Sequence, residues 1–121
     1  MTVFDASALL AFLQGEAGAD VVESALEDGG STGAANWSET AQKVLASGRD
    51  WTLAASLLES YPFTVEPVTQ ADAEWAAARW RTGEGLSLGD RLCLALGERL
   101  DRVVLTADRQ WGSKGRVRQI R

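Results

Sequence analysis

The feature that most constrains the fold of this chain is a set of short apolar segments whose residues do not alternate in polarity. The clearest lie at residues 2–5, 63–68 and within 101–108, weaker ones lie at 31–36 and 117–120, and helical patterns separate them. Strands buried on both faces are apolar throughout, whereas strands with one exposed face alternate. The sequence therefore predicts an α/β fold in three layers, α/β/α, with a short, mostly parallel central sheet and right-handed crossovers.

Length and composition favour one cytoplasmic domain. The chain has 121 residues, of which 45% are hydrophobic, and we expect a single domain over residues 1–121. No apolar run reaches the roughly 18 residues of a membrane span. The first residues lack the basic and apolar regions of a signal peptide. The single cysteine, Cys93, lies in an apolar context and is predicted to be a core residue.

The sequence contains no histidine. This absence excludes nucleophilic catalysis by Ser-His or Cys-His pairs, and it excludes metal sites that include histidine. Any hydrolytic chemistry must therefore depend on carboxylates, hydroxyls, basic groups or metal ions bound by oxygen.

The net charge of −5 conceals an asymmetry along the chain. Residues 1–78 carry a net charge of −10, and residues 79–121 carry +5. An acidic protein binds nucleic acid poorly in general, but a local basic face can still bind a phosphate backbone. From charge alone, the basic residues are equally well explained as solubilising the C-terminal helices.

Four acidic residues are predicted to lie at one edge of the sheet. Asp5 ends the first strand and Asp108 follows a late strand, while Glu39 is expected in the first turn of one helix and Asp90 near the start of another. Ligands of parallel sheets collect beyond the carboxyl ends of the strands, where the helices that follow also begin. All four carboxylates could therefore converge on one cleft.

Each acid also has an ordinary structural explanation. Glu39 and Asp90 would be favoured at helix N-termini by the helix dipole, and Asp108 could begin a turn. Asp5 is harder to explain in this way, because the end of a buried strand is an unfavourable place for a lone charge.

Carboxylates gathered in one cleft repel one another unless a cation joins them. Mg²⁺ or Mn²⁺, as one ion or two, fits best because both prefer carboxylate and water ligands. Such ions lower the pKa of a water and stabilise a phosphodiester during in-line attack, so the predicted reaction is phosphodiester hydrolysis. Four basic residues close in sequence to the last two acids could hold the backbone of the substrate: Arg91, Arg109, Lys114 and Arg116.

The sequence resembles the PIN-domain ribonucleases, and among them the VapC-type toxins of bacterial toxin–antitoxin pairs. The segments VFDASALLAFL, WSE, LSLGDRLCLAL and VLTADRQW carry the resemblance, which covers essentially the whole chain. DASAL and TAD are weak signals alone but are specific together with SLGDR-x-C-x-A-L. Residues 48–67 carry no matching motif.

The resemblance implies a Rossmann-like PIN fold and a Mg²⁺- or Mn²⁺-dependent endoribonuclease that leaves a 5′-phosphate and a 3′-hydroxyl. It implies inhibition by a small VapB-like antitoxin, a homodimer, and a heterotetramer or larger complex with that antitoxin. Carried over by position, the catalytic acids are Asp5, Glu39, Asp90 and Asp108, the metal ligands among them are Asp5, Asp90 and Asp108, and the supporting hydroxyls are Ser7 and Thr106.

Two other functions stay open at this point. A phosphatase of the haloacid-dehalogenase type would need a second acid where Ser7 stands. A PIN-like module that binds RNA or a partner without cutting would leave the acidic set unused. The five tryptophans are best explained as packing residues; an apolar groove for an antitoxin helix, or base stacking on Trp111, is the alternative.

Overall fold

Five short parallel strands form the centre of the computed structural model, which describes residues 1–121. The strands are ordered β3-β2-β1-β4-β5 across the sheet, and every pairing is parallel, as the apolar segments predict. Their bounds are β1 Thr2–Phe4, β2 Gly30–Gly33, β3 Phe63–Glu66, β4 Val103–Thr106 and β5 Val117–Gln119. The helices are α1 Ala6–Gln14, α2 Ala19–Asp28, α3 Ala34–Ala46, α4 Trp51–Glu59, α5 Gln70–Ala78 and α6 Leu88–Leu100, with a 3₁₀ turn η1 at Arg109–Trp111.

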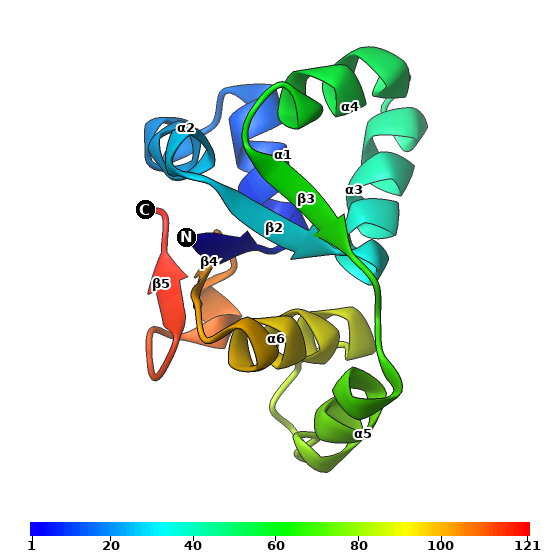
Figure 1. Cartoon of the computed structure of the whole chain (residues 1–121), viewed down its shortest axis with the longest axis vertical. Coiled ribbons are helices and arrows are strands. Elements are labelled where there is room, and N and C mark those ends of the chain that lie inside the picture. The colour runs from blue at the N-terminus through cyan, green and yellow to red at the C-terminus, as the bar shows by residue number, and fades with distance from the viewer.

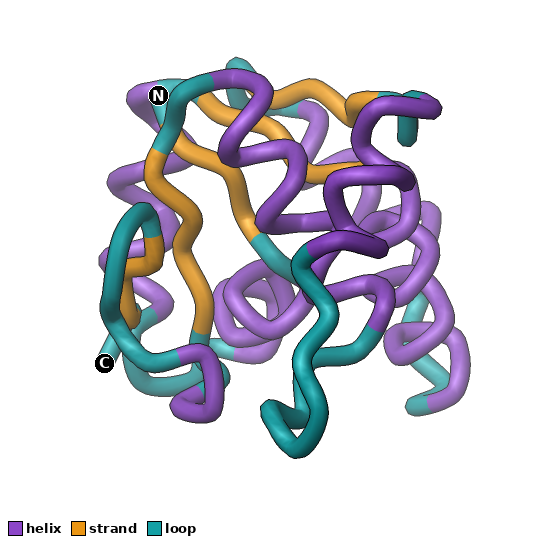
Figure 2. Tube along the Cα trace, turned by 90° about the horizontal axis from the view of Figure 1, so that it is seen from below, coloured by secondary structure: helices purple, strands orange, loops and turns teal.

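Helices cover both faces of this sheet, so the fold is the predicted three-layer α/β. Helix α6 lies on one side of the strands with α5 outside it, whereas α1 and α2 lie on the other side (Figure 1). In the view from below, helices make up most of the chain and the strands are short segments among them (Figure 2).

The central strand shows why its residues are apolar without alternation. Val3 and Phe4 are both fully buried, but Val3 packs with Cys93 and Leu96 of α6, and Phe4 packs with residues of α1 and α2. Successive side chains of a strand point to opposite faces, and here each face meets a helix. Burial of Cys93 confirms that the single cysteine is a core residue.

Two helices differ in extent from what their sequence patterns predict. Helix α3 begins at Ala34, directly after β2, instead of near residues 36–38. Two alanines, which favour helix strongly, begin it, and Glu39 consequently lies in its second turn and not its first. Helix α5 ends at Ala78 rather than running to Gly83, and Arg79 then forms a two-point ion pair with Glu84 at 2.6 and 3.0 Å. The longest helices have 13 residues, and none is long and apolar enough to cross a bilayer.

Candidate active site

Asp5 stands at the end of β1 and is the N-cap of α1. Its Oδ1 accepts a hydrogen bond from the Ala8 amide at 2.8 Å. Ser7 donates to the carboxylate at 2.8 Å, and Thr106 of β4 donates to Oδ2 at 2.5 Å. The side chain that caps the helix is thus Asp5, which leaves Ser7 free to bond Asp5 from within the first turn.

Burial raises the pKa of Asp5 from its ordinary 3.8 to about 6, and the charge of Asp90 adds a smaller rise. Asp5 is only 4% exposed, so water compensates little of its charge. Hydrogen bonds from Thr106, Ala8 and Ser7 act in the opposite direction because they favour the ionised form. Three hydrogen-bond donors therefore orient the Asp5 carboxylate, while its burial disfavours the ionised form.

Ser7 and Thr106 connect the ends of two neighbouring strands. Besides donating to Asp5, Ser7 accepts from the Ala107 amide at 2.9 Å, and Thr106 accepts from the Asp108 amide at 3.0 Å. The two hydroxyls are 3.2 Å apart. Parallel pairing of β1 with β4 aligns Phe4 with Leu105, and this register brings the residues that follow each strand together.

Glu39 and Asp90 approach the same edge from α3 and α6. The Glu39 Oε1 atom lies over the start of α6, 3.5 Å from where a Cβ on Gly89 would stand. Burial raises the pKa of the Cys93 thiol well above its usual value, and the charges of Asp5, Asp90 and Glu39 raise it further. The charges of three predicted acids are therefore felt at one buried thiol on α6.

Asp90 and Asp108 also have the structural roles that their positions suggest. Asp90 forms a capping box with Ser87, in which its Oδ2 accepts from the Ser87 amide at 3.0 Å. Asp108 caps η1, and its Oδ1 accepts from the Gln110 amide at 2.9 Å. Each carboxylate keeps one oxygen without a hydrogen-bond partner in the protein. The backbone amide of Asp108 donates to Thr106, which in turn donates to Asp5.

The four predicted basic residues lie in different surroundings. Arg91 donates to the Ala76 carbonyl at 2.7 Å, toward α5. Arg116 is paired with Glu98 at 2.9 Å and Asp101 at 2.8 Å. The two that are exposed and form no ion pair are Arg109 and Lys114.

Asn36 belongs to this site and is recognised only in the structure. Its side chain is 1% exposed, donates to the Gly89 carbonyl at 3.2 Å, and leaves Oδ1 without a partner. This contact ties α3 to the start of α6 and so positions Glu39 relative to Asp90. The only sequence signal for this role is its position three residues, about one helical turn, before Glu39.

The acidic side chains at the carboxyl edge of the sheet offer carboxylate oxygens, which are suitable ligands for a hard divalent cation. No three acidic or thiol side chains lie close enough together to surround an ion by themselves. Mg²⁺ usually binds through one or two carboxylates, with waters and substrate phosphates as the other ligands. The unpartnered oxygens of Asp90 and Asp108, beside the buried carboxylate of Asp5, fit that mode.

Comparison with known proteins identifies the fold. The solved structure of a toxin–antitoxin complex from Klebsiella pneumoniae contains a similar chain, with a TM-score of 0.78 and 18% identity over 100% of this chain and 98% of that one. No curated protein matches the sequence. The family model of the PIN domain matches residues 2–117. The chain therefore belongs to the PIN-domain family.

Proposed function

We propose that this protein is a metal-dependent endoribonuclease that acts as the toxin of a toxin–antitoxin pair. The observation that carries the proposal is the convergence of carboxylates from separate elements at the carboxyl edge of a parallel sheet. Asp5 follows β1, Glu39 comes from α3 and Asp90 from α6, and Asp108 is linked to Asp5 through Thr106. A chain without histidine has few other means of hydrolysing a phosphodiester.

Asp5, Asp90 and Asp108 would hold Mg²⁺ or Mn²⁺ together with waters or a substrate phosphate, because no three acidic side chains are close enough to surround an ion by themselves. When bound, the cation would supply positive charge for the scissile phosphate and a water of lowered pKa. Asp5 contributes a carboxylate that Ser7 and Thr106 hold in one orientation. A cation bound beside Asp5 would lower its raised pKa and so favour the ionised carboxylate.

Glu39 is proposed to orient or deprotonate the attacking water. It is half-buried, and its only ion pair is a 3.8 Å contact with Lys43. Asn36 holds the backbone of α3 against α6, which keeps Glu39 over the start of α6. Arg109 and Lys114 are the cations free to bind the RNA backbone, because the other two predicted basic residues are already engaged.

An antitoxin is the proposed partner, and the similar chain from Klebsiella pneumoniae is part of a toxin–antitoxin complex. A cleft of about 210 Å³ between α1, α3 and α4 offers an apolar surface, and Leu53 and Leu57, which line it, are 69% and 44% exposed. An amphipathic helix would bury these side chains. Trp37 and Trp51, two of the five tryptophans, pack on each other with ring centroids 4.8 Å apart. We propose a homodimer that forms a heterotetramer or larger complex with the antitoxin.

An arginine of the antitoxin that entered the acidic edge would compete with the metal. Calorimetry of Mn²⁺ binding to the free protein and to the complex tests this part of the proposal. We expect much weaker Mn²⁺ binding in the complex, and equal affinities would contradict direct competition.

The first test of function is cleavage of total cellular RNA by the purified protein with Mg²⁺ or Mn²⁺, and with EDTA as a control. We expect discrete fragments that disappear with EDTA and with Asp90→Asn. Asparagine can still accept the hydrogen bond from Ser87, so this variant keeps its helix cap. Asp20→Asn, in the exposed first turn of α2, is the matched control and is expected to cleave normally.

Induced expression in a bacterial host tests the toxin assignment. The parent protein is expected to arrest growth, and Asp90→Asn is expected not to. Growth arrest that persists in Asp90→Asn would separate toxicity from the acidic site. Absence of cleavage with either metal, by a folded protein free of antitoxin, would instead support the module that binds without cutting.

A further inference from the structure

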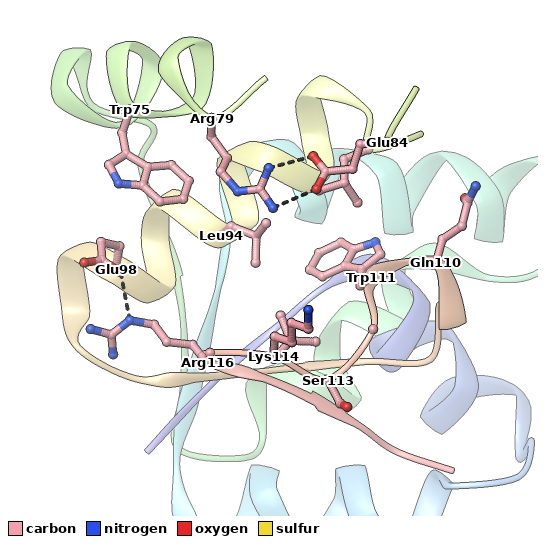
Figure 3. Close-up of a pocket in the computed structure, with 14 residues that line it drawn as sticks. Trp75, Arg79, Glu84, Leu94, Glu98, Gln110, Trp111, Ser113, Lys114 and Arg116 are labelled. Carbon is pink, nitrogen blue, oxygen red and sulfur yellow. Dashed lines mark hydrogen bonds and ion pairs between the residues drawn. The ribbon is translucent and has the colours of Figure 1, made fainter. Parts of the chain in front are cut away.

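A cavity of about 610 Å³ opens beside the acidic edge and is not used by the proposed chemistry. It lies between α5, α6 and the segment that joins β4 to β5 (Figure 3). Its size falls within the usual range of roughly 300–1,000 Å³ for small-ligand sites. We propose that this cavity binds an unpaired nucleotide of the RNA that flanks the scissile phosphodiester. The proposal rests on the endoribonuclease function and names its substrate as single-stranded RNA with a base turned out.

Two segments of the chain run from the candidate active site to the cavity. Gln110 and Trp111, which line it, directly follow the turn begun by Asp108. On α6, Leu94 and Glu98 follow Asp90 at spacings of four residues and therefore lie along the same side of the helix. Under the proposal, RNA bound at the carboxylates follows these two segments to reach the cavity.

Aromatic and apolar side chains form walls that suit a planar base. Trp75 from α5 and Trp111 from η1 lie on either side of Leu94 (Figure 3). Trp111 is 9% exposed and packs in the core, so it is a fixed surface, whereas Trp75 is half-buried and its indole extends from α5 toward the cavity. Bases stack on tryptophan without strong sequence preference, and unpaired RNA bases are commonly recognised in this way.

The charges around the cavity leave one cation free. Arg79 is paired with Glu84, and Arg116 with Glu98. Lys114 is exposed, forms no ion pair, and is directed toward the space beside Trp111 (Figure 3). One free ammonium beside stacking surfaces matches one phosphate attached to one base.

The polar lining favours a nucleotide over an apolar protein segment. Only five of the 14 lining residues are hydrophobic, compared with five of eight in the cleft proposed for the antitoxin. The amide of Gln110 and the hydroxyl of Ser113 can donate to and accept from the edge of a base. A helix that buries an apolar face would leave these groups unpaired.

The test measures binding separately from cleavage. Asp90→Asn protein, in EDTA, is titrated into a fluorescein-labelled single-stranded RNA of eight mixed nucleotides, and into the same chain lacking all bases, with anisotropy as the readout. We expect the chain without bases to bind more weakly. Trp75→Leu, added to this background, keeps an apolar side chain but removes the aromatic face. It is expected to raise the Kd by roughly 5- to 100-fold. Trp80→Leu, which alters a tryptophan that is 58% exposed and outside the cavity, is the control and is expected to stay within about twofold.

Lys114→Ala provides a second variant that cannot disturb the core, because the side chain is exposed. We expect it to weaken binding and to reduce the salt dependence of the Kd. Arg121→Ala removes an exposed cation that forms no ion pair and lines neither cleft, and it is the charge-matched control. Unchanged Kd in both Trp75→Leu and Lys114→Ala, or equal affinity for the chain without bases, would overturn the proposal. Unchanged RNA affinity together with loss of inhibition by the antitoxin would assign the cavity to the protein partner.

Failure of this inference can be distinguished from failure of the proposed function. RNA cleavage that continues in an otherwise unaltered Trp75→Leu protein, together with unchanged RNA affinity, would leave the nuclease assignment intact and remove the nucleotide site. Binding that depends on Trp75, in a parent protein that never cleaves, would keep the nucleotide site and remove the nuclease.

Discussion

Replacing Asp5 with asparagine is expected to stabilise the folded protein at neutral pH while abolishing cleavage. Asp5 is 4% exposed, and burial raises its pKa from 3.8 to about 6. A carboxyl whose pKa is raised in the folded state favours folding in its protonated form. For Asp5 this contribution to the free energy of unfolding is complete below pH 3.8, the pKa in the unfolded chain, and is lost as the pH rises through about 6, the pKa in the folded protein. The difference of about two pKa units corresponds to a penalty on the order of 3 kcal/mol at pH 7.5, at about 1.4 kcal/mol per unit.

Asparagine avoids this penalty but loses part of the hydrogen bonding. Its Oδ1 can accept from the Ala8 amide as Asp5 does, and asparagine and aspartate are equally good N-caps. The Nδ2 group would replace the oxygen that accepts from Thr106, at a cost of roughly 0.5–1.5 kcal/mol. The net gain in the free energy of unfolding is therefore expected to be about 2 kcal/mol at pH 7.5.

Urea denaturation of the parent and of Asp5→Asn in EDTA, at pH 4 and pH 7.5, measures this gain. The gain should disappear or reverse at pH 4, where the folded parent is protonated at Asp5. Asp20→Asn makes the same chemical change at an exposed residue and is expected to alter stability by less than about 0.5 kcal/mol at both pH values. An Asp5→Asn protein that is less stable than the parent at pH 7.5, or a difference that does not change with pH, would refute the reasoning.

Three further perturbations test other contacts of the fold and site. Gly97→Ala is expected to lower the free energy of unfolding by roughly 1–3 kcal/mol despite the better helix propensity of alanine, because the new Cβ would lie 2.5 Å from Cγ2 of Val104. Chemical denaturation measures this change. A more stable variant would show that α6 can move away from β4. Ser7→Ala removes a hydrogen-bond donor that lowers the pKa of Asp5, so the pKa of Asp5 should rise above about 6. A ¹³C NMR titration of the carboxyl carbons measures this pKa. An unchanged pKa would mean that the hydrogen bond does not form in solution. Cys93 is fully buried and the pKa of its thiol is raised, so iodoacetamide should label it only after denaturation, and rapid labelling of the native protein would contradict its place in the core.

Much of this architecture follows from local patterns in the sequence. The parallel sheet is predictable from adjacent apolar residues such as Val3 and Phe4. These two side chains point to opposite faces of the sheet, so both faces must be covered, as is typical of parallel sheets. Asp5 stood out for a similar reason, since a lone acid at the end of such a strand must be compensated. The capping box of Ser87 and Asp90 is likewise local, because it involves residues three apart in one turn.

The sequence by itself determined that short strands alternate with helices, and that Asp5, Asp90 and Asp108 stand where a strand ends or a helix begins. The tertiary structure decided how these acids meet, because that depends on the register of β1 with β4 and on the contact of α3 with α6. The role of Asn36 and the cavity between Trp75 and Trp111 both arise from residues distant in sequence. Local propensity cannot encode such contacts, since they form only when separate elements pack together.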